Sequence, residues 1–99
     1  MIRHVVLCRF RKDADVAQVF AAISALKEKI PGILAVTCGK DNSPEGLQKG
    51  FTHGFTVDFM DAAARDAYLP HPDHQVVGKM VVAALEGGLD GLAVMDWEI

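Results

Sequence analysis

Four stretches of the chain have the apolar patterns of β-strands. In residues 51–60, large apolar and aromatic side chains at odd-numbered positions alternate with smaller or polar ones, which is typical of a strand with one face in the core. Residues 2–10 are so densely apolar that both faces of this strand should be at least partly covered. The remaining strands are predicted at residues 33–39 and 91–99.

A helix is predicted between the first two strands. Its apolar residues recur at spacings of three and four, as one buried helix face requires. They are Val16, Val19, Phe20, Ile23, Leu26 and Ile30. Asp13 or Asp15 can cap the start of this helix, and Pro31-Gly32 ends it.

A second helical segment, between the third and fourth strands, is interrupted. Asp61 should cap its first part, and Pro70 and Pro72 then break the helix because each removes an amide donor and restricts its neighbour. We expect Asp73 to cap a restarted helix, which ends at Gly87-Gly88. Residues 39–50 between the second and third strands are polar, contain several turn-forming residues and should project from the domain.

The order β-α-β-β-α-β predicts a single α+β domain, residues 1–99, with the ferredoxin-like fold. We expect a four-stranded antiparallel sheet, with the first and third strands as parallel neighbours at its centre and the helices on one face. The other face would expose Val5, Leu7, Thr52, Gly54 and Thr56. Because this surface is too apolar to leave in water, we expect a homodimer that closes into a dimeric α/β barrel.

Composition and charge exclude several classes of partner. Thirteen acidic and ten basic residues give a formal charge of -3, and the basic residues form no stripe, so nucleic acid is not an expected partner. No apolar run approaches the about 20 residues needed to cross a membrane, so a cytoplasmic protein is expected. Cys8 and Cys38 form no C-x-x-C pair and are predicted to be buried free thiols.

Candidate chemistry is concentrated in four residues: His4, His53, Tyr68 and His74. If the two central strands are parallel, His4 and His53 lie at the same end of the sheet, and the Pro70-His-Pro72 break can turn Tyr68 and His74 toward them. Histidine exchanges protons near neutral pH, and a protonated tyrosine can donate a hydrogen bond to a carbonyl or an enolate. The alternative is structural, with tyrosine packing its ring and histidine capping the helix.

A pocket at this site would be lined by Phe20, Phe55, Val57 and His71. His71 and His74 do not make a full ligand set, so no metal centre is predicted. The loop at residues 39–50 lacks the spacing of a phosphate-binding loop, and no cofactor is expected.

Several of these motifs together resemble the stress-responsive A/B barrel domain (Dabb) family over nearly the whole chain. They are His4-Val-Val-Leu-Cys-Arg-Phe10, Ile30-Pro-Gly32, Gly39-Lys-Asp41, Gly50-Phe-Thr-His-Gly-Phe-Thr-Val57 and Tyr68-Leu-Pro-His-Pro-Asp-His74. The resemblance implies a ferredoxin-like subunit in a homodimeric barrel. The chain is also similar, in the same motifs, to a plant polyketide cyclase of the family. This similarity implies an acid-base pair at Tyr68 and His74 supported by His4 and His53.

Three functional hypotheses follow. The first is a dimeric stress-associated protein that binds a small, partly apolar molecule without turnover. The second is a cofactor-free lyase or cyclase, in which neutral His74 removes an acidic C–H proton while Tyr68 stabilises the enolate. The third is a cofactor-independent monooxygenase, a chemistry found on similar barrels.

Overall fold

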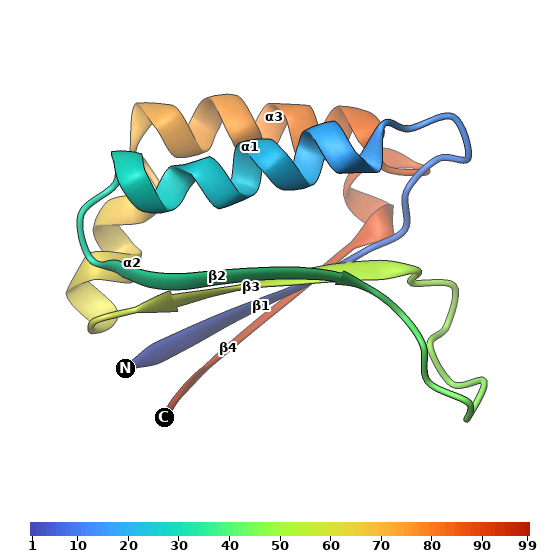
Figure 1. Ribbon diagram of the computed structural model, residues 1–99, viewed down its shortest axis with the longest axis horizontal. Helices are drawn as coiled ribbons and strands as arrows, with labels where there is room; N and C mark the ends of the chain where they lie inside the picture. The colour runs from blue at the N-terminus through green and yellow to red at the C-terminus, as the bar shows by residue number, and fades with distance from the viewer.

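The computed structural model describes all 99 residues as two layers, with helices on one face of a single sheet (Figure 1). The elements, in chain order, are β1 (Ile2–Cys8), α1 (Val16–Lys29), β2 (Ile33–Lys40), β3 (His53–Phe59), α2 (Ala62–Tyr68), α3 (Pro72–Ala84), the 3₁₀ helix η1 (Gly88–Gly91) and β4 (Leu92–Glu98). The predicted element order is confirmed, and the chain is an α+β domain of the ferredoxin-like type.

The sheet has the strand order β2-β3-β1-β4, and every neighbouring pair is antiparallel. The expectation that β1 and β3 run parallel is therefore wrong. The crossover through α1 makes β2 run in the same direction as β1, and the direct connection to β3 then reverses the chain. In the observed register His4 faces Val57 and His53 faces Cys8, so the two histidines lie at opposite ends of the sheet.

Local sequence signals explain where the helices begin. The Asp15 carboxylate accepts a hydrogen bond from the Gln18 amide at 3.1 Å, and the Asp61 carboxylate accepts one from the Ala64 amide at 2.8 Å. Helix α3 is capped by the His71 imidazole rather than by Asp73, with 3.1 Å between His71 Nδ1 and the Asp73 amide. The prediction for Asp73 was wrong because Pro72 is the first helical residue, a position that proline favours.

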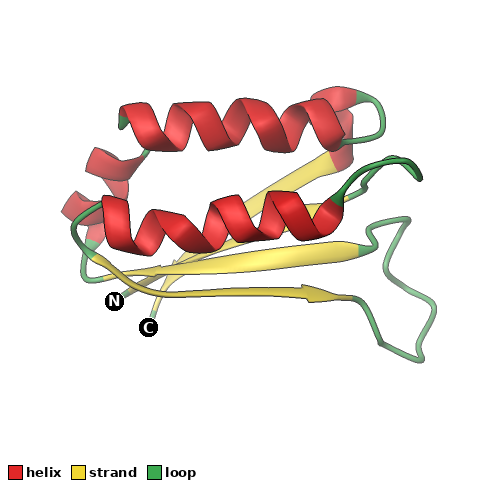
Figure 2. Cartoon of the chain, turned by 45° about the horizontal axis from the view of Figure 1, so that its top comes forward, coloured by secondary structure: helices red, strands yellow, loops and turns green.

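Figure 2 shows the helices as a layer over one face of the sheet, and the hydrophobic core is built from side chains of both layers. Its most deeply buried members are Phe59, Ile23, Leu26, Val57 and Cys8. Cys8 is fully buried as predicted, whereas Cys38, on the edge strand β2, is only partly buried, and no disulfide joins them. None of the helices has the length and apolar character that a membrane span requires.

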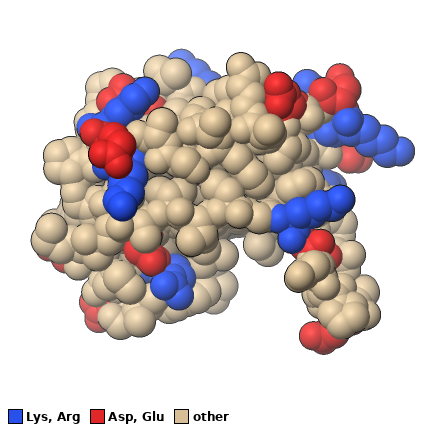
Figure 3. All heavy atoms as spheres, in the orientation of Figure 1, with Lys and Arg blue, Asp and Glu red and all other residues tan.

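The sheet face opposite the helices is uncovered and partly apolar. Leu7 is 42% exposed, Met95 68% and Trp97 46%. Arg3 and Asp58 form a bidentate ion pair on the same face, with 2.9 and 3.1 Å between guanidinium nitrogens and carboxylate oxygens. In the view of Figure 3, basic and acidic side chains are interspersed at the ends of the molecule and do not form a basic stripe.

Candidate functional site

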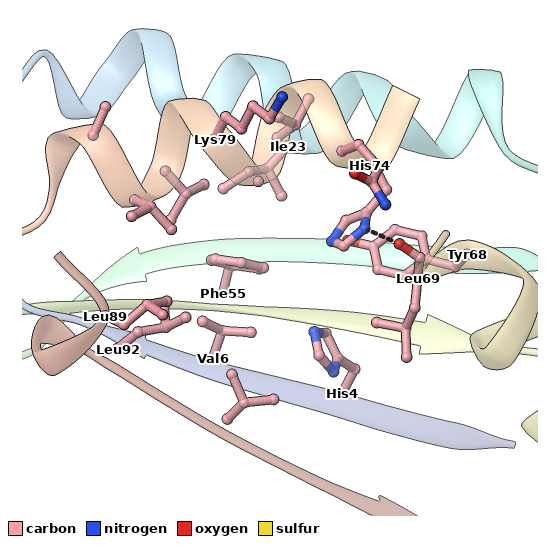
Figure 4. Close-up of a pocket in the computed structure, with 17 residues that line it drawn as sticks. His4, Val6, Ile23, Phe55, Tyr68, Leu69, His74, Lys79, Leu89 and Leu92 are labelled. Atoms are coloured by element: carbon pink, nitrogen blue, oxygen red, sulfur yellow. Dashed lines mark hydrogen bonds between the residues drawn. The ribbon is translucent and has the colours of Figure 1, made fainter. Parts of the chain in front are cut away.

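A pocket with a cavity volume of about 680 Å³ opens between α3, η1 and the β1–β4 side of the sheet (Figure 4). Most of its walls are apolar side chains. Among them are Val6, Ile23, Phe55, Val81, Val82, Leu89, Leu92 and Val94. The rings of His4, Tyr68 and His74 form a polar cluster at one end. A concave apolar site with a few convergent polar groups is the usual form of a small-molecule site.

Tyr68, the last residue of α2, contributes a hydroxyl that no group of the protein hydrogen-bonds. The side chain is only 2% exposed, and its ring packs edge-on against Phe59 with 4.8 Å between ring centroids. Burial raises the pKa of Tyr68 to about 12. The phenol is therefore protonated at neutral pH and can donate a hydrogen bond to an oxygen in the pocket.

His74, in the first turn of α3, lies beside Tyr68, with 4.1 Å between ring centroids. Its Nδ1 is 2.9 Å from the Leu69 carbonyl oxygen. Because a carbonyl oxygen can only accept, Nδ1 donates this hydrogen bond, and the Nε2 of the neutral ring has a free lone pair. Burial lowers the pKa of His74 below its ordinary value, and nearby His4 and His71 lower it further, while the bond to Leu69 opposes the shift. The ring is thus a neutral acceptor or base.

Gly78, one turn after His74, leaves space beside this acceptor. The nearest atom to a Cβ placed on Gly78 would be His74 Nε2, at 4.0 Å. A larger side chain at this position would project over the imidazole and narrow the pocket. Gly78 could not be predicted from the sequence, since an isolated glycine within a helix has no specific meaning before the helix is placed.

His4 completes the polar end of the pocket, where a chain of hydrogen-bonded side chains holds its ring. The ring is 7% exposed, and its Nδ1 is 2.7 Å from Asp96 Oδ1 on the neighbouring strand β4. The other Asp96 oxygen accepts a hydrogen bond from Arg65 Nη1 at 3.1 Å. Arg65 also forms an ion pair with the exposed Asp66, with 2.8 Å between Arg65 Nε and Asp66 Oδ1. Asp96 orients the His4 ring, and Arg65 orients Asp96.

His53 does not belong to this site. It lies at the far end of the sheet, where its ring packs edge-on against Phe10 and Phe20 with 5.3 and 5.9 Å between centroids. Its Nδ1 is 2.8 Å from Thr52 Oγ1, and burial and the charge of Lys40 lower the pKa of its ring. The predicted convergence of four residues is thus reduced to His4, Tyr68 and His74.

Among the predicted lining residues, only Phe55 reaches the pocket. Phe20 is beside His53, Val57 is fully buried in the core, and His71 caps α3. Residues that were not predicted from the sequence, such as Leu69, Leu89 and Val94, line the pocket instead. No group of three or more His, Cys, Asp or Glu side chains is arranged to hold a metal ion.

The fold and this pocket define a ferredoxin-like subunit of the A/B barrel class. The family model described as "Stress Responsive A/B Barrel Domain" matches residues 2–99. The chain therefore belongs to the stress-responsive A/B barrel domain family, as its motifs indicated.

Three relatives illustrate the range of this family and fold. A stress-response A/B barrel domain-containing protein of Arabidopsis thaliana is 26% identical, over 98% of this chain and 85% of its own length. A dimeric ferredoxin-like protein from Jannaschia sp. is 31% identical, with a TM-score of 0.87, over 99% of this chain and 98% of that one. A hydroxynitrile lyase from Passiflora edulis shares the fold at 23% identity, with a TM-score of 0.87 over 99% and 92% of the two chains.

Proposed function

We propose that this protein is a homodimer whose subunits each bind a small, partly apolar molecule in the pocket between α3 and the sheet. The observation that supports this proposal most strongly is the composition of the pocket. Mainly apolar walls border an open pocket of about 680 Å³, and an unpartnered hydroxyl and a free imidazole lone pair lie together at one end. Such a site would take a molecule with an apolar body and an oxygen-bearing head.

The dimer would cover the uncovered face of the sheet. Leu7, Met95 and Trp97 expose large apolar side chains there, and burial of such surface is the main favourable term in association. The Jannaschia protein, which is 31% identical over nearly the whole chain, is described as dimeric. Face-to-face association would leave the pocket accessible, because its walls belong to the helix side of the sheet.

The two polar groups define the ligand's head. At neutral pH the Tyr68 hydroxyl donates a hydrogen bond, so a carbonyl oxygen of the ligand would pair with it. His74 Nε2 accepts, so a hydroxyl or an acidic C–H of the ligand would face the imidazole. The apolar body of the molecule would lie along Leu89 and Leu92, at the other end of the pocket. An aryl ketone of moderate size satisfies these requirements.

A second candidate function, cofactor-free acid-base catalysis, is favoured by the tautomer of His74. Its Nε2 would take a proton from the carbon next to a carbonyl, giving an imidazolium. The C–H electron pair would form the C=C bond of the enolate, and the π pair of the carbonyl would move to its oxygen. Tyr68 would donate a hydrogen bond to the enolate so formed, and return of the proton would restore the neutral ring. The Leu69 carbonyl fixes the required tautomer. The oxygenase hypothesis stays a prediction.

Phenylacetone tests both candidates, because it has an aryl body, a carbonyl and an enolisable C–H. Binding is measured by calorimetry, and loss of the benzylic proton in D2O is followed by NMR. We expect saturable binding, and for the catalytic candidate an exchange rate that falls on the order of a hundredfold in His74→Ala. Val76→Ala is the matched control, since this residue is on the same helix but 70% exposed. Absence of binding at millimolar concentration would contradict the proposed function.

A further inference from the structure

A second hollow lies on the uncovered side of the sheet, below its far end. It has a cavity volume of about 420 Å³ and is lined by the loop of residues 41–52 and by the ends of β1, β2 and β3. Figure 1 shows this loop hanging below the plane of the sheet, on the side away from the helices. The walls include Leu7, Leu47 and Phe51.

Two glycines form the floor of this hollow. Gly39 and Gly54 face each other across β2 and β3, and they share the uncovered face with Thr37 and Thr56, whose hydroxyls are hydrogen-bonded to each other. A Cβ on Gly39 would meet no atom within 4 Å. Where neighbouring strands normally present two side chains, this sheet therefore presents only backbone. We call the hollow over Gly39 and Gly54 the glycine slot.

The slot is preformed within one subunit. The Asp41 amide donates to the Thr52 carbonyl at 2.8 Å, and the Thr52 amide donates to the Cys8 carbonyl at 3.0 Å. The Arg9 guanidinium lies over the Phe51 ring, 5.1 Å from its centroid, and its Nη2 donates to the Asp90 carbonyl at 3.3 Å. These contacts fix the base of the loop and Phe51 against the sheet, so this part of the wall would not need to be ordered on binding.

The same face presents a large side chain at the opposite corner. Trp97 on β4 lies across from Arg3, whereas Gly54 lies across from Leu7. Four residues along β1 correspond to about 13 Å, and the distance from β4 to the midline between β3 and β2 is about 12 Å. Consider two such sheets that face each other across a two-fold axis lying between them at about 45° to the strands. This axis places Trp97 of one subunit opposite the glycine slot of its partner. It makes the sheets cross at about 90°, which is one of the two usual packing angles.

We propose that the glycine slot of each subunit receives the partner subunit's Trp97 in the homodimer. This proposal rests on the homodimer proposed above and specifies its contact. The indole would lie on the backbone of Gly39 and Gly54 and against Leu7, and its N–H would find acceptors among Asp41, Glu45 and Gln48 at the rim of the slot. Two such contacts per dimer would place an aromatic anchor in a preformed pocket, the arrangement that dominates interface energies.

Trp97 itself is the probe, because it is the only tryptophan of the chain. Its emission is recorded over a range of protein concentrations, with sedimentation measured in parallel. We expect the emission to shift to shorter wavelength, and acrylamide quenching to fall, as the dimer forms. Trp97→Ala should raise the dimer dissociation constant on the order of a hundredfold or more, whereas Val76→Ala should leave it unchanged.

Gly39→Leu fills the slot and leaves Trp97 in place. The subunit should tolerate this change, because the added side chain enters open space and glycine is itself unfavourable within a strand. We expect the dissociation constant to rise at least about tenfold, and the double variant Gly39→Leu/Trp97→Ala to bind itself more tightly than the two single effects predict. Circular dichroism confirms that each variant is folded.

The possible failures are distinguishable. A wild-type dimer with water-exposed Trp97, or a Gly39→Leu variant that dimerises as tightly as wild type with the same emission, would overturn the slot contact alone. A wild-type protein that stays monomeric at all concentrations would overturn both the slot contact and the homodimer. Neither result affects the binding of phenylacetone, which is measured separately.

Discussion

Tyr68→Phe should separate the function of the pocket from the stability of the fold. The phenyl ring keeps its contact with Phe59, and only a hydroxyl without a protein hydrogen bond is lost. Removal of such a group should change the free energy of unfolding by less than about 1 kcal/mol. For a chain of this size, this corresponds to a shift in Tm of no more than about 8 °C.

The effect on the ligand should be much larger. Tyr68 is the only hydroxyl donor at the polar end of the pocket, so its loss should slow phenylacetone exchange on the order of a hundredfold. This is about 2.7 kcal/mol of transition-state stabilisation. Thermal unfolding by circular dichroism and proton exchange by NMR measure the two quantities on the same sample.

Two results would contradict these expectations for Tyr68. Strong destabilisation of Tyr68→Phe would show that the hydroxyl is hydrogen-bonded within the fold and has a structural role. Exchange and binding equal to wild type would show that the hydroxyl does not contact the ligand. Tyr68→Ala is the contrasting variant, because loss of a buried ring should cost about 3–5 kcal/mol of stability.

Three further predictions test other parts of the structure. Catalysed exchange should fall as the pH drops through the lowered pKa of His74, since only the neutral ring accepts a proton, so the acidic limb of a pH–rate profile should lie below pH 6.5; an acidic limb above 6.5 would contradict the assignment. Cys38 should react with a thiol reagent in the native state faster than Cys8, whose pKa burial raises to about 11, and equal rates would contradict their placement. Asp61→Ala should lower the free energy of unfolding by about 1 kcal/mol through loss of the α2 cap, measured by urea denaturation; an unchanged free energy would count against the cap.

Local patterns in the sequence were sufficient to predict the elements and the faces of the strands. Period two places His4 on the same face as Val6, and the structure confirms that both point toward the helices. The caps at Asp15 and Asp61 follow from side chains that bond amides three residues away. These features depend on residues close together in sequence, where elementary stereochemistry determines the outcome.

The site itself depends on strand direction and register, which local patterns do not determine. The parallel direction predicted for β3 placed His53 at the pocket, whereas the residue lies at the far end of the sheet. The partnership of His4 with Asp96 joins residues 92 positions apart and can be derived only when the pairing of β1 with β4 is known. Arg65 was missed for the same reason, since its significance comes from Asp96.

Whether His74 and Tyr68 bind the head of a small molecule can be read from a nitrogen-15 spectrum of the histidine rings. At neutral pH, His74 should be the tautomer with its proton on Nδ1, because the Leu69 carbonyl accepts that proton. Addition of phenylacetone should shift the signals of His74 and His4 and leave those of His53, at the other end of the sheet, unchanged. A proton on Nε2 of His74, or ligand-induced shifts at His53 but not at His74, would contradict the account.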